Sequence, residues 1–325
     1  MRGRSQNILV IKTDGLAAFV AAEPLYEAIR AAHPGARISL LTQPHLQRVA
    51  RASPYFDQVA AMPDFRDPDS RKAFVRQVQS SRFSYIYDLA ANEDARRLYS
   101  ALGLFRPKWR SVTPASRFGR KRNAPEENLP DTRKFSAAAG VEAVDRLPDF
   151  RWALSTRKDA ANMQPSWFGV SGVYGLLMPG IDESRRWPAA RYAELARMMA
   201  QKGVMPVMIG QKELHGFADE VAHAAPELVD LTGKADHLQF VSLAQSAAFF
   251  VSDAAEEVHL ALSVGCSGVM IRKTGEEHLS PKGRNVITLT TRAGLEEAKA
   301  EFVWRALENM GLIPKGSASP RAAVR

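Results

Sequence analysis

Short runs of branched apolar residues alternate along the chain with longer stretches whose apolar residues recur at helical spacing. The first run, 8–11, is followed by a polar loop and then by an amphipathic stretch over 16–32. This order predicts a strand, a loop and a helix. The runs that come next predict strands at 37–42 and 83–89 and a helix at 44–52. Strands that alternate with helices favour a parallel sheet covered on both faces.

The alternation stops in the middle of the chain and begins again after a polar, proline-containing connection at 147–166. In this second series we expect strands at 173–178, 204–209, 248–252, 268–271 and 286–289. We expect helices at 189–202, 213–224, 238–246, 258–264 and 295–310. The whole pattern predicts an α/β protein with two doubly wound, Rossmann-like parallel-sheet lobes, at 1–155 and 170–293, and a closing helix at 294–312.

A segment without periodicity separates the two series. Over 105–134, nine Lys or Arg stand against three acids, an excess of six in a chain of formal net charge +9. We therefore expect an irregular basic loop there, with an anionic partner, followed by a helical piece at about 132–139. The last residues, 313–325, are rich in small and basic side chains and are expected to form a disordered tail.

Composition narrows the class of protein. Hydrophobic residues make up 46% and charged residues 24% of the 325 residues, which excludes a wholly disordered or fibrous chain. The single cysteine, Cys266, excludes an internal disulfide and any multi-cysteine metal site, and the seven histidines are scattered, so we expect no metal. No apolar run reaches the roughly 18–20 residues of a membrane span, and the start lacks a signal-peptide pattern. We therefore expect a cytoplasmic protein.

In doubly wound folds, ligands bind in the loops that follow the carboxyl ends of the strands. The loops in question are 12–18, 88–94, 179–188, 210–213, 253–259 and 272–281. The loop 179–188 reads Pro-Gly-Ile-Asp-Glu-Ser-Arg-Arg-Trp-Pro, and its two guanidiniums before a helix start suit a pyrophosphate. The alternative is a surface arginine pair beside a packing tryptophan.

Several motifs occur together with this loop in a fixed order. Arg-Arg-Trp-Pro-Ala-Ala-Arg-Tyr (185–192) is followed by Val-Met-Ile-Gly (207–210) and by Asp-Leu-Thr-Gly-Lys (230–234). Earlier in the chain come Ile-Leu-Val-Ile-Lys (8–12) and Tyr-Asp-Leu (87–89). Over roughly 7–289 the sequence resembles glycosyltransferase family 9, the ADP-heptose:lipopolysaccharide heptosyltransferases.

This resemblance implies a GT-B fold, in which two Rossmann-like lobes face a cleft. It also implies an inverting transfer, without metal or other cofactor, of heptose from ADP-heptose to a lipopolysaccharide core sugar. The implied partners are a nucleotide sugar and an anionic glycolipid acceptor, and the implied location is the cytoplasm, with peripheral contact to the inner membrane. Such a transfer needs a carboxylate to deprotonate the acceptor hydroxyl, and cationic or backbone donors for the leaving diphosphate.

The loop after the first strand departs from the family pattern. The family typically has Gly-Asp-Phe-Val there, with the aspartate as the catalytic base, whereas this chain has Ala17 and Ala18 at the glycine and aspartate positions. A methyl group accepts no proton, so Asp14 is the nearest replacement base. Its alternative role is that of a turn or N-cap aspartate before the helix. The family's polar residue after Tyr-Asp-Leu is also replaced, by Ala90.

The family's donor loop, Asn-Asp-Ser/Thr-Gly-x-x-His, differs as well. Asp253 stands at the asparagine position, Ala254 and Ala255 replace the aspartate and the hydroxyl residue, and the motif ends on His259. Glu256 replaces the glycine, and its negative charge should repel a diphosphate at close range.

Other positions keep a polar or basic residue. The resemblance assigns donor binding to Lys12, Arg185, Arg186, Thr232, Gly233, Lys234, Asp253, His259 and Thr274. Arg185 replaces a family lysine that meets the diphosphate and keeps its charge. Arg272 replaces a small family residue, where its side chain either binds phosphate or fills the pocket. His259 has the alternative of packing within its helix, and Lys234 that of a solvated lysine.

Two functions are compatible with these departures. The first is a glycosyltransferase with impaired or altered catalysis, in which Asp14 replaces the base. The second is an inactive pseudo-glycosyltransferase that serves as a scaffold for a glycan, a nucleotide or a protein. For the basic loop 105–134 we expect contact with phosphorylated glycolipid or the inner leaflet rather than with nucleic acid, because no nucleic-acid motif accompanies its aromatic residues. A solvated loop without a partner is the remaining alternative.

Overall fold

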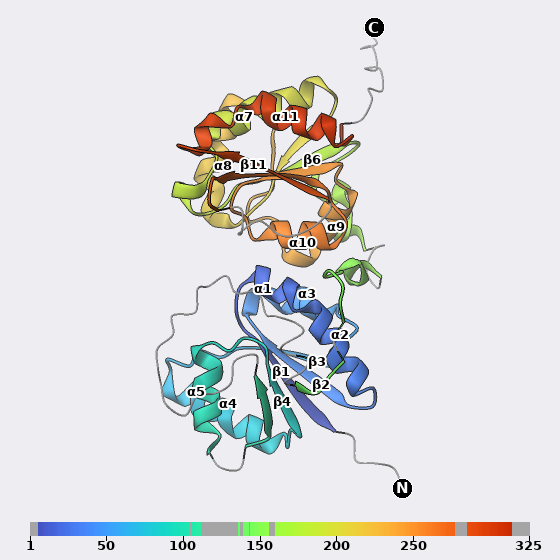
Figure 1. Ribbon diagram of the computed structural model, residues 1–325, viewed down its shortest axis with the longest axis vertical. Coiled ribbons are helices and arrows are strands. Elements are labelled where there is room, and N and C mark those ends of the chain that lie inside the picture. Colours follow the sequence, from blue (N-terminus) through green and yellow to red (C-terminus); the bar gives the residue numbers. More distant parts are fainter. Residues whose placement is uncertain are drawn as a thin grey trace. The chain divides into compact units, whose positions relative to one another are not determined.

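A computed structural model of the chain describes residues 6–103, 106–111, 136, 139–142, 144–155, 160–276 and 285–313. The chain divides into two compact units, Met1–Ala153 (unit 1) and Leu154–Arg325 (unit 2). Each unit is a parallel sheet with helices on both faces (Figure 1). The predicted α/β class with two doubly wound lobes is confirmed.

Unit 1 is built on a five-stranded parallel sheet in the order β3-β2-β1-β4-β5. Its strands are β1 (Asn7–Lys12), β2 (Arg37–Thr42), β3 (Gln58–Ala61), β4 (Tyr85–Asp88) and β5 (Lys108–Ser111). The predicted strands at 8–11, 37–42 and 83–89 correspond to β1, β2 and β4. Strand order reverses between β1 and β4, which makes their carboxyl ends the switch point of this unit.

The helices of unit 1 cover both faces of the sheet. They are α1 (Leu16–Ala21), α2 (Glu23–Ala32), η1 (Pro44–Leu46), α3 (Gln47–Arg51), α4 (Pro68–Ser80) and α5 (Glu93–Ala101). Figure 1 shows α1, α2 and α3 on one face and α4 and α5 on the other. The face under α4 and α5 is filled by apolar side chains such as Ile11, Ile86, Val78 and Leu98.

Two of the predicted elements of unit 1 are wrong. The single helix over 16–32 is broken at Ala22, because Pro24 has no N–H to donate to the preceding turn and instead starts α2. The irregular loop from 105 onward contains β5, which pairs in parallel with β4. The rest of the basic loop 105–134, most of the predicted helix 132–139 and nearly all of the tail 313–325 lie outside the described residues.

Unit 2 has a six-stranded parallel sheet in the order β11-β10-β9-β6-β7-β8. Its strands are β6 (Tyr174–Met178), β7 (Met205–Met208), β8 (Val229–Asp230), β9 (Phe249–Ser252), β10 (Gly268–Lys273) and β11 (Val286–Thr291). All five predicted strands are present, and β8 adds a short sixth. The switch point of this unit lies between β6 and β9.

Helices again flank the sheet of unit 2. They are α7 (Ala189–Gln201), α8 (His215–Ala224), α9 (His237–Ser246), α10 (Glu257–Ser263) and α11 (Ala300–Asn309), with short 3₁₀ turns η3 (Arg151–Leu154), η4 (Ala161–Met163), η5 (Pro165–Phe168), η6 (Glu183–Arg185), η7 (Lys212–Leu214) and η9 (Leu295–Glu297). The predicted closing helix corresponds to η9 and α11, and α11 packs on α7 within unit 2. Across the described ranges, no helix combines the length and the apolar character needed to cross a bilayer.

Candidate functional site

A buried lysine joins the carboxyl ends of β1 and β4 at the switch point of unit 1. Lys12 ends β1 and is 0% exposed. Its ammonium donates to the Asp14 carboxylate at 2.8 Å and to the Leu89 carbonyl, just after β4, at 3.0 Å. Burial lowers the pKa of Lys12 below its usual value, and the Asp14 charge offsets part of this effect. The lysine therefore fixes the loop that carries the candidate base.

Asp14 lies in a loop that neighbouring side chains hold in place. Gln43 donates to the Thr13 carbonyl at 2.5 Å, and Asn92 donates to the Thr13 hydroxyl at 2.8 Å. The Asp14 side chain is 30% exposed; its Oδ2 accepts from the lysine, whereas Oδ1 has no hydrogen-bond partner among the described residues. The N-cap of α1 is Gly15, without a side-chain cap, so the N-cap interpretation of Asp14 is wrong. One carboxylate oxygen is therefore anchored to the lysine, and the other, Oδ1, is buried without a hydrogen-bond partner among the described residues.

Ala17 and Ala18 are half-buried on α1, immediately after this loop. Neither side chain has a polar atom, so the first turn of α1 offers no group for proton transfer. Asp14 is the only carboxylate within 12–18. Its role as replacement base stays a prediction.

A second carboxylate, Asp88, ends β4 at the same switch point. Asp88 is 3% exposed and accepts hydrogen bonds from the Ala91 amide at 2.8 Å and the Ser111 hydroxyl at 3.0 Å. Burial raises the pKa of Asp88, although these hydrogen bonds oppose the change. Its charge also acts on Lys12. Sequence reasoning missed this residue, although a carboxylate at the end of a predicted strand is a usable signal.

Sequence reasoning also missed an ion-pair network around a buried glutamate at the start of α2. Glu23, in the first turn of α2, is 0% exposed and accepts from Arg146 at 2.6 and 2.8 Å and from the Tyr55 hydroxyl at 2.6 Å. Arg146 also bonds Glu27, and these carboxylates raise the pKa of Arg146 above its usual value. The Asp149 amide donates to Glu23 at 3.1 Å. The network fastens the segment around 146–149 to α2.

In unit 2 a buried aspartate occupies the switch point. Asp253 follows β9 and is 0% exposed. Its carboxylate accepts from the Gly180 amide at 2.6 Å, the Trp187 amide at 2.8 Å and the Tyr192 hydroxyl at 3.0 Å, and from the amide of Ala254. Burial raises the pKa of Asp253, while the hydrogen bonds act against this shift. The side chain ties the loop after β9 to the loop after β6.

The two tied loops are in close contact. A Cβ atom added to Gly180 would lie 2.7 Å from Ala254 Cβ and 2.9 Å from the Ala254 carbonyl carbon, so only glycine fits there. Trp187 is fully buried, and its indole N–H donates to the Ala298 carbonyl at 2.8 Å. The tryptophan of the loop 179–188 is therefore a packing residue, as one interpretation of the sequence expected.

The two arginines of this loop already have partners within unit 2. Arg185 Nε lies 3.5 Å from a carboxylate oxygen of Glu276. The Arg186 guanidinium lies 4.5 Å from the centre of the Phe217 ring, and it pairs with Glu183 at 3.3 Å. An incoming diphosphate would compete with Glu276 for Arg185.

The motif 230–234 forms a tight turn after β8. Thr232, which is 0% exposed, donates through its amide at 2.8 Å and its hydroxyl at 2.7 Å to Asp230. Lys234 is half-exposed and bonds the Asp230 carbonyl at 2.7 Å. Gly233 has φ +65°, and a Cβ there would lie 2.9 Å from Lys212 Cβ, so the turn requires glycine. Thr232 is used within the turn, and Lys234 is a solvated lysine with a local partner.

The helix α10 begins with the degenerate part of the donor motif. Glu256 is exposed at its N-cap, without a side-chain cap. Burial, and then the charge of Arg272, lower the pKa of the half-buried His259 to about 4, so this imidazole is neutral at pH 7. Arg272 is only 6% exposed at the end of β10. The Thr274 hydroxyl donates to the Thr291 carbonyl at 3.0 Å. At the carboxyl ends of β9 and β10, this chain therefore carries a negative charge on Glu256 and a positive charge on Arg272. The family pattern has small residues at both positions.

A cavity of about 460 Å³ lies beside the start of α7. Its walls carry both signs of charge, and they are formed by Glu183, Ser184, Arg186, Trp187, Pro188, Ala189, Phe217, Glu220, Lys273, Leu295 and Glu296. In the part of the chain that the structure describes, no three His, Cys, Asp or Glu side chains gather in a way that could hold a metal ion.

The predicted site residues divide between the units. Lys12 and Asp14 lie together in unit 1, whereas all other residues assigned to donor binding lie in unit 2. Within unit 2, the loop 179–188, which carries Arg185 and Arg186, is bound through its backbone to Asp253 at the β6–β9 switch point. Their assignment to donor binding stays a prediction.

Comparisons with known structures agree with this architecture. A family 9 glycosyltransferase from Veillonella parvula matches with a TM-score of 0.73 and 16% identity, over 95% of this chain and 98% of that chain. ADP-heptose lps heptosyltransferase II from E. coli matches with a TM-score of 0.73 and 15% identity, over 94% and 98%. The E. coli heptosyltransferase WaaC, solved with ADP, gives the same TM-score and 15% identity, over 94% and 100%. At these identities the matches establish the GT-B fold.

A comparison with curated protein sequences finds no match. The model of glycosyltransferase family 9 (heptosyltransferase) matches residues 121–301, which is more than half of the chain and includes all donor motifs of unit 2. The resemblance that the motifs indicate is therefore confirmed, and the protein belongs to glycosyltransferase family 9.

Proposed function

We propose that this protein binds an ADP-sugar at the β6–β9 switch point of unit 2 and transfers the sugar with impaired or altered catalysis. One observation carries the proposal: the base position of the family holds Ala18, and the nearest carboxylate, Asp14, has one oxygen bound to the Lys12 ammonium. Loss of a well-placed general base typically costs about 10²–10⁴-fold in rate. The remaining oxygen, Asp14 Oδ1, is the group we assign as the replacement base.

The donor is proposed from the family and from the charges at the loop edges. One E. coli relative was solved with ADP, and here Arg185 lies in the loop after β6 and Arg272 near the end of β10. Guanidiniums are suited to a diphosphate leaving group. The acceptor that we propose is an anionic glycolipid of the lipopolysaccharide type, reached from the cytoplasm by a protein that touches the inner leaflet peripherally.

A pseudo-glycosyltransferase is the second candidate, and the charges at the donor edge favour it. Glu276 neutralises Arg185, and Glu256 stands exposed at the start of α10. Both carboxylates oppose a diphosphate at short range. In this alternative the protein binds a nucleotide or a glycan without turnover and acts as a scaffold.

Calorimetry with ADP and ADP-heptose, followed by a product assay with an acceptor extract, separates the two candidates. The transferase proposal expects binding and slow turnover, with turnover abolished in Asp14→Asn. Asparagine keeps an oxygen that can accept from the Lys12 ammonium, so this variant removes the base and its charge but preserves the hydrogen bond. Asp64→Asn, at an exposed residue, is the matched control and should keep full turnover. Binding without turnover supports the scaffold, and turnover that survives in Asp14→Asn contradicts the assigned base.

A further inference from the structure

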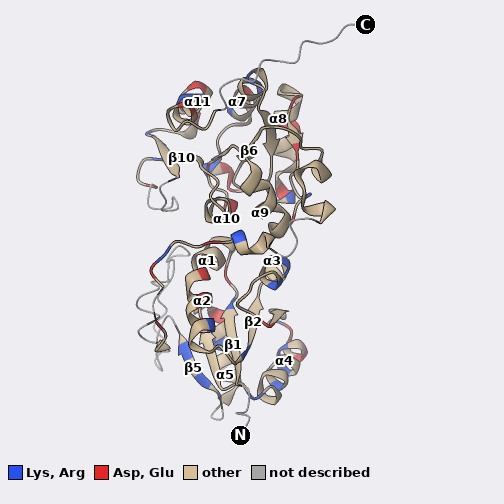
Figure 2. Ribbon diagram, turned by 90° about the vertical axis from the view of Figure 1, so that its right-hand side faces the viewer, with Lys and Arg blue, Asp and Glu red and all other residues tan. Residues whose placement is uncertain are grey.

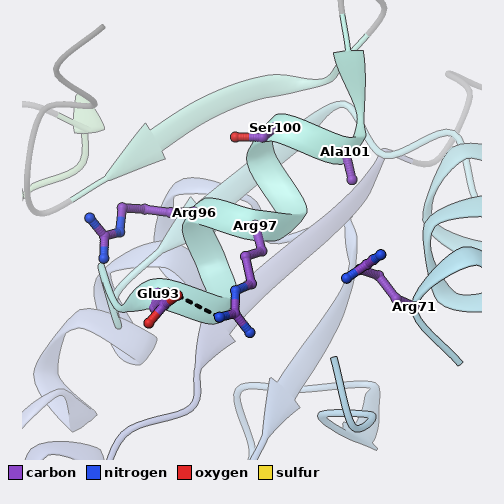
Figure 3. Close-up of a pocket in the computed structure, with 6 residues that line it drawn as sticks. All are labelled: Arg71, Glu93, Arg96, Arg97, Ser100 and Ala101. Atoms are coloured by element: carbon purple, nitrogen blue, oxygen red, sulfur yellow. Dashed lines mark hydrogen bonds and ion pairs between the residues drawn. The ribbon is translucent and has the colours of Figure 1, made fainter. Parts of the chain in front are cut away.

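A second cavity, of about 590 Å³, lies in unit 1 on the sheet face that α4 and α5 cover (Figure 3). It is open to solvent and is lined by Arg71, Glu93, Arg96, Arg97, Ser100 and Ala101. Apart from Glu93, at the end of the loop 88–94, none of these residues belongs to the switch-point loops, and none comes from the motifs that indicate the family. The proposed transfer chemistry gives this cavity no role.

The charges of the lining residues are strongly unbalanced. Three guanidiniums face one carboxylate, so the walls carry a net charge of +2. Figure 3 shows the Arg71 side chain reaching from α4 toward α5, where Ala101 and Arg97 lie, with Arg96 on the far side of Glu93. Like charges on the two helices repel each other, and an anion bound between them would remove this repulsion.

Both facing guanidiniums are held in position but keep most of their donors. Arg97 pairs with Glu93 at 2.5 Å and with Asp94 at 3.8 Å, and half-buried Arg71 donates to the Phe65 carbonyl at 3.3 Å. Each guanidinium carries five N–H donors, and within the described ranges one hydrogen bond engages each of them. The small side chains of Ser100 and Ala101 leave the space between the cations open.

We propose that this cavity, the α4–α5 arginine site, binds the phosphate group of an anionic ligand. Forked guanidinium donors match phosphate oxygens in pairs, and the net charge of +2 favours a phosphomonoester, whose charge is near −2 at pH 7, over a carboxylate. Ser100 adds a hydroxyl donor. The phosphate has two candidate sources, a soluble phosphorylated compound and the headgroup of an anionic lipid.

Aromatic and basic side chains near the α4–α5 arginine site suit contact with a lipid headgroup. The ring centres of Trp109 and Tyr99 lie 5.1 Å apart, and the Arg106 guanidinium lies 4.0 Å from the centre of the Tyr99 ring. Figure 2 shows further Lys and Arg along α4 and on β5, the edge strand of the sheet. Basic and amphipathic aromatic side chains together are typical of surfaces that meet anionic headgroups.

The test compares the full chain with Arg71→Gln/Arg97→Gln. Glycerol 3-phosphate and inorganic phosphate are titrated at constant ionic strength. Vesicles of phosphatidylcholine with phosphatidic acid, a lipid whose headgroup is a phosphomonoester, are used in flotation. The control, Lys72→Gln/Arg76→Gln, removes the same charge from exposed positions on α4 outside the lining. We expect binding to weaken about tenfold or more in the first variant and less than about twofold in the control.

A third variant, Arg71→Lys/Arg97→Lys, keeps the charge and the fold but loses the forked donors, and it should bind with intermediate strength. Binding of the soluble probes that depends on both arginines assigns the site to a free phosphate compound. Binding of vesicles alone with the same dependence assigns it to a lipid headgroup. Equal weakening in the control, unchanged binding in Arg71→Gln/Arg97→Gln, or no binding of any probe by the wild type overturns the proposal.

Discussion

The two units share a winding pattern but secure their switch points with opposite charges. In unit 1 the Lys12 ammonium bridges from β1 to the Leu89 carbonyl, and in unit 2 the Asp253 carboxylate bridges from β9 to the loop after β6. Both side chains are 0% exposed. Each charged side chain forms hydrogen bonds with backbone groups of a neighbouring loop. Without it, these buried backbone groups would need water or another partner.

The partners of the two charges differ in kind. Asp253 is satisfied by neutral amides and a hydroxyl, all inside unit 2. Lys12 forms its ion pair with Asp14, whose side chain is 30% exposed, and the charge of buried Asp88 acts on it as well. Asp253 therefore only stabilises unit 2. The buried charge of Lys12, by contrast, makes the stability of unit 1 depend on Asp14, the residue proposed as the base.

The largest expected effect comes from removing the carboxylate of unit 2. Asp253→Ala leaves the amides of Gly180 and Trp187 and the Tyr192 hydroxyl buried without an acceptor. We expect the free energy of unfolding of unit 2 to fall by about 3–5 kcal/mol. Urea unfolding measures this change, with exposed Asp219→Ala as the control. A loss below about 1 kcal/mol would show that water or a rearranged loop replaces the carboxylate.

A smaller loss is expected in unit 1, and it should depend on a second residue. Asp14→Ala removes the carboxylate that neutralises the buried Lys12 ammonium, which should cost about 2–3 kcal/mol of unfolding free energy. Lys12→Met in the same chain removes the stranded charge, so the double variant should be more stable than the sum of the single losses predicts. Additive losses in this double-mutant cycle would separate Lys12 from Asp14 energetically.

The free energy of unfolding should depend on pH through His259 on α10. The pKa of His259 is about 4 in the folded chain against a usual 6.5, so the unfolded chain takes up the proton first as pH falls. The stability contribution of neutral His259 is present above pH 6.5 and is lost as pH falls toward 4, by about 2 kcal/mol at pH 5. The difference in unfolding free energy between wild type and His259→Gln, measured from pH 7.5 to 4.5, isolates this contribution. A difference that is constant with pH would mean that His259 titrates normally.

The smallest expected effect concerns the ion pair between Arg185 and Glu276, in the loops proposed to bind the donor. Glu276→Gln releases Arg185, whose side chain is 28% exposed, and should tighten ADP binding about two- to fivefold. Calorimetry measures the change, and Glu301→Gln, at an exposed residue of α11, controls for the lost charge. If both variants bind ADP equally, Arg185 does not meet the diphosphate.

Most of the fold could be predicted from the sequence because the inner strands are continuous apolar runs. The strands β1, β2, β6 and β9 are buried on both faces, which gives them a local signature. The edge strand β5 reads Lys-Trp-Arg-Ser and has no such signature, since its place is set by pairing with β4. The helix α4 buries Val78 but little else, although Asp67 before Pro68 is a visible N-cap signal.

The candidate site was only partly predictable. The loops that carry it could be located, because they follow predicted strands. The use of Asp253 could not, because its donors lie 66 and 73 residues earlier in the chain and no local pattern connects them. The Glu23–Arg146 pair, 123 residues apart, escaped for the same reason. Spacing identifies an element, whereas long-range partners decide what a polar residue does.

The position of Asp253 also has a consequence for biosynthesis. Gly180 and Trp187 leave the ribosome 73 and 66 residues before the carboxylate that their amides bind. A nascent chain that stops short of residue 253 therefore has β6 and its loop without their fastening. In unit 1, by contrast, all strands that the structure describes end by residue 111. During translation, unit 1 can therefore form its sheet first. The loops of unit 2 are joined only after Asp253 has emerged from the ribosome.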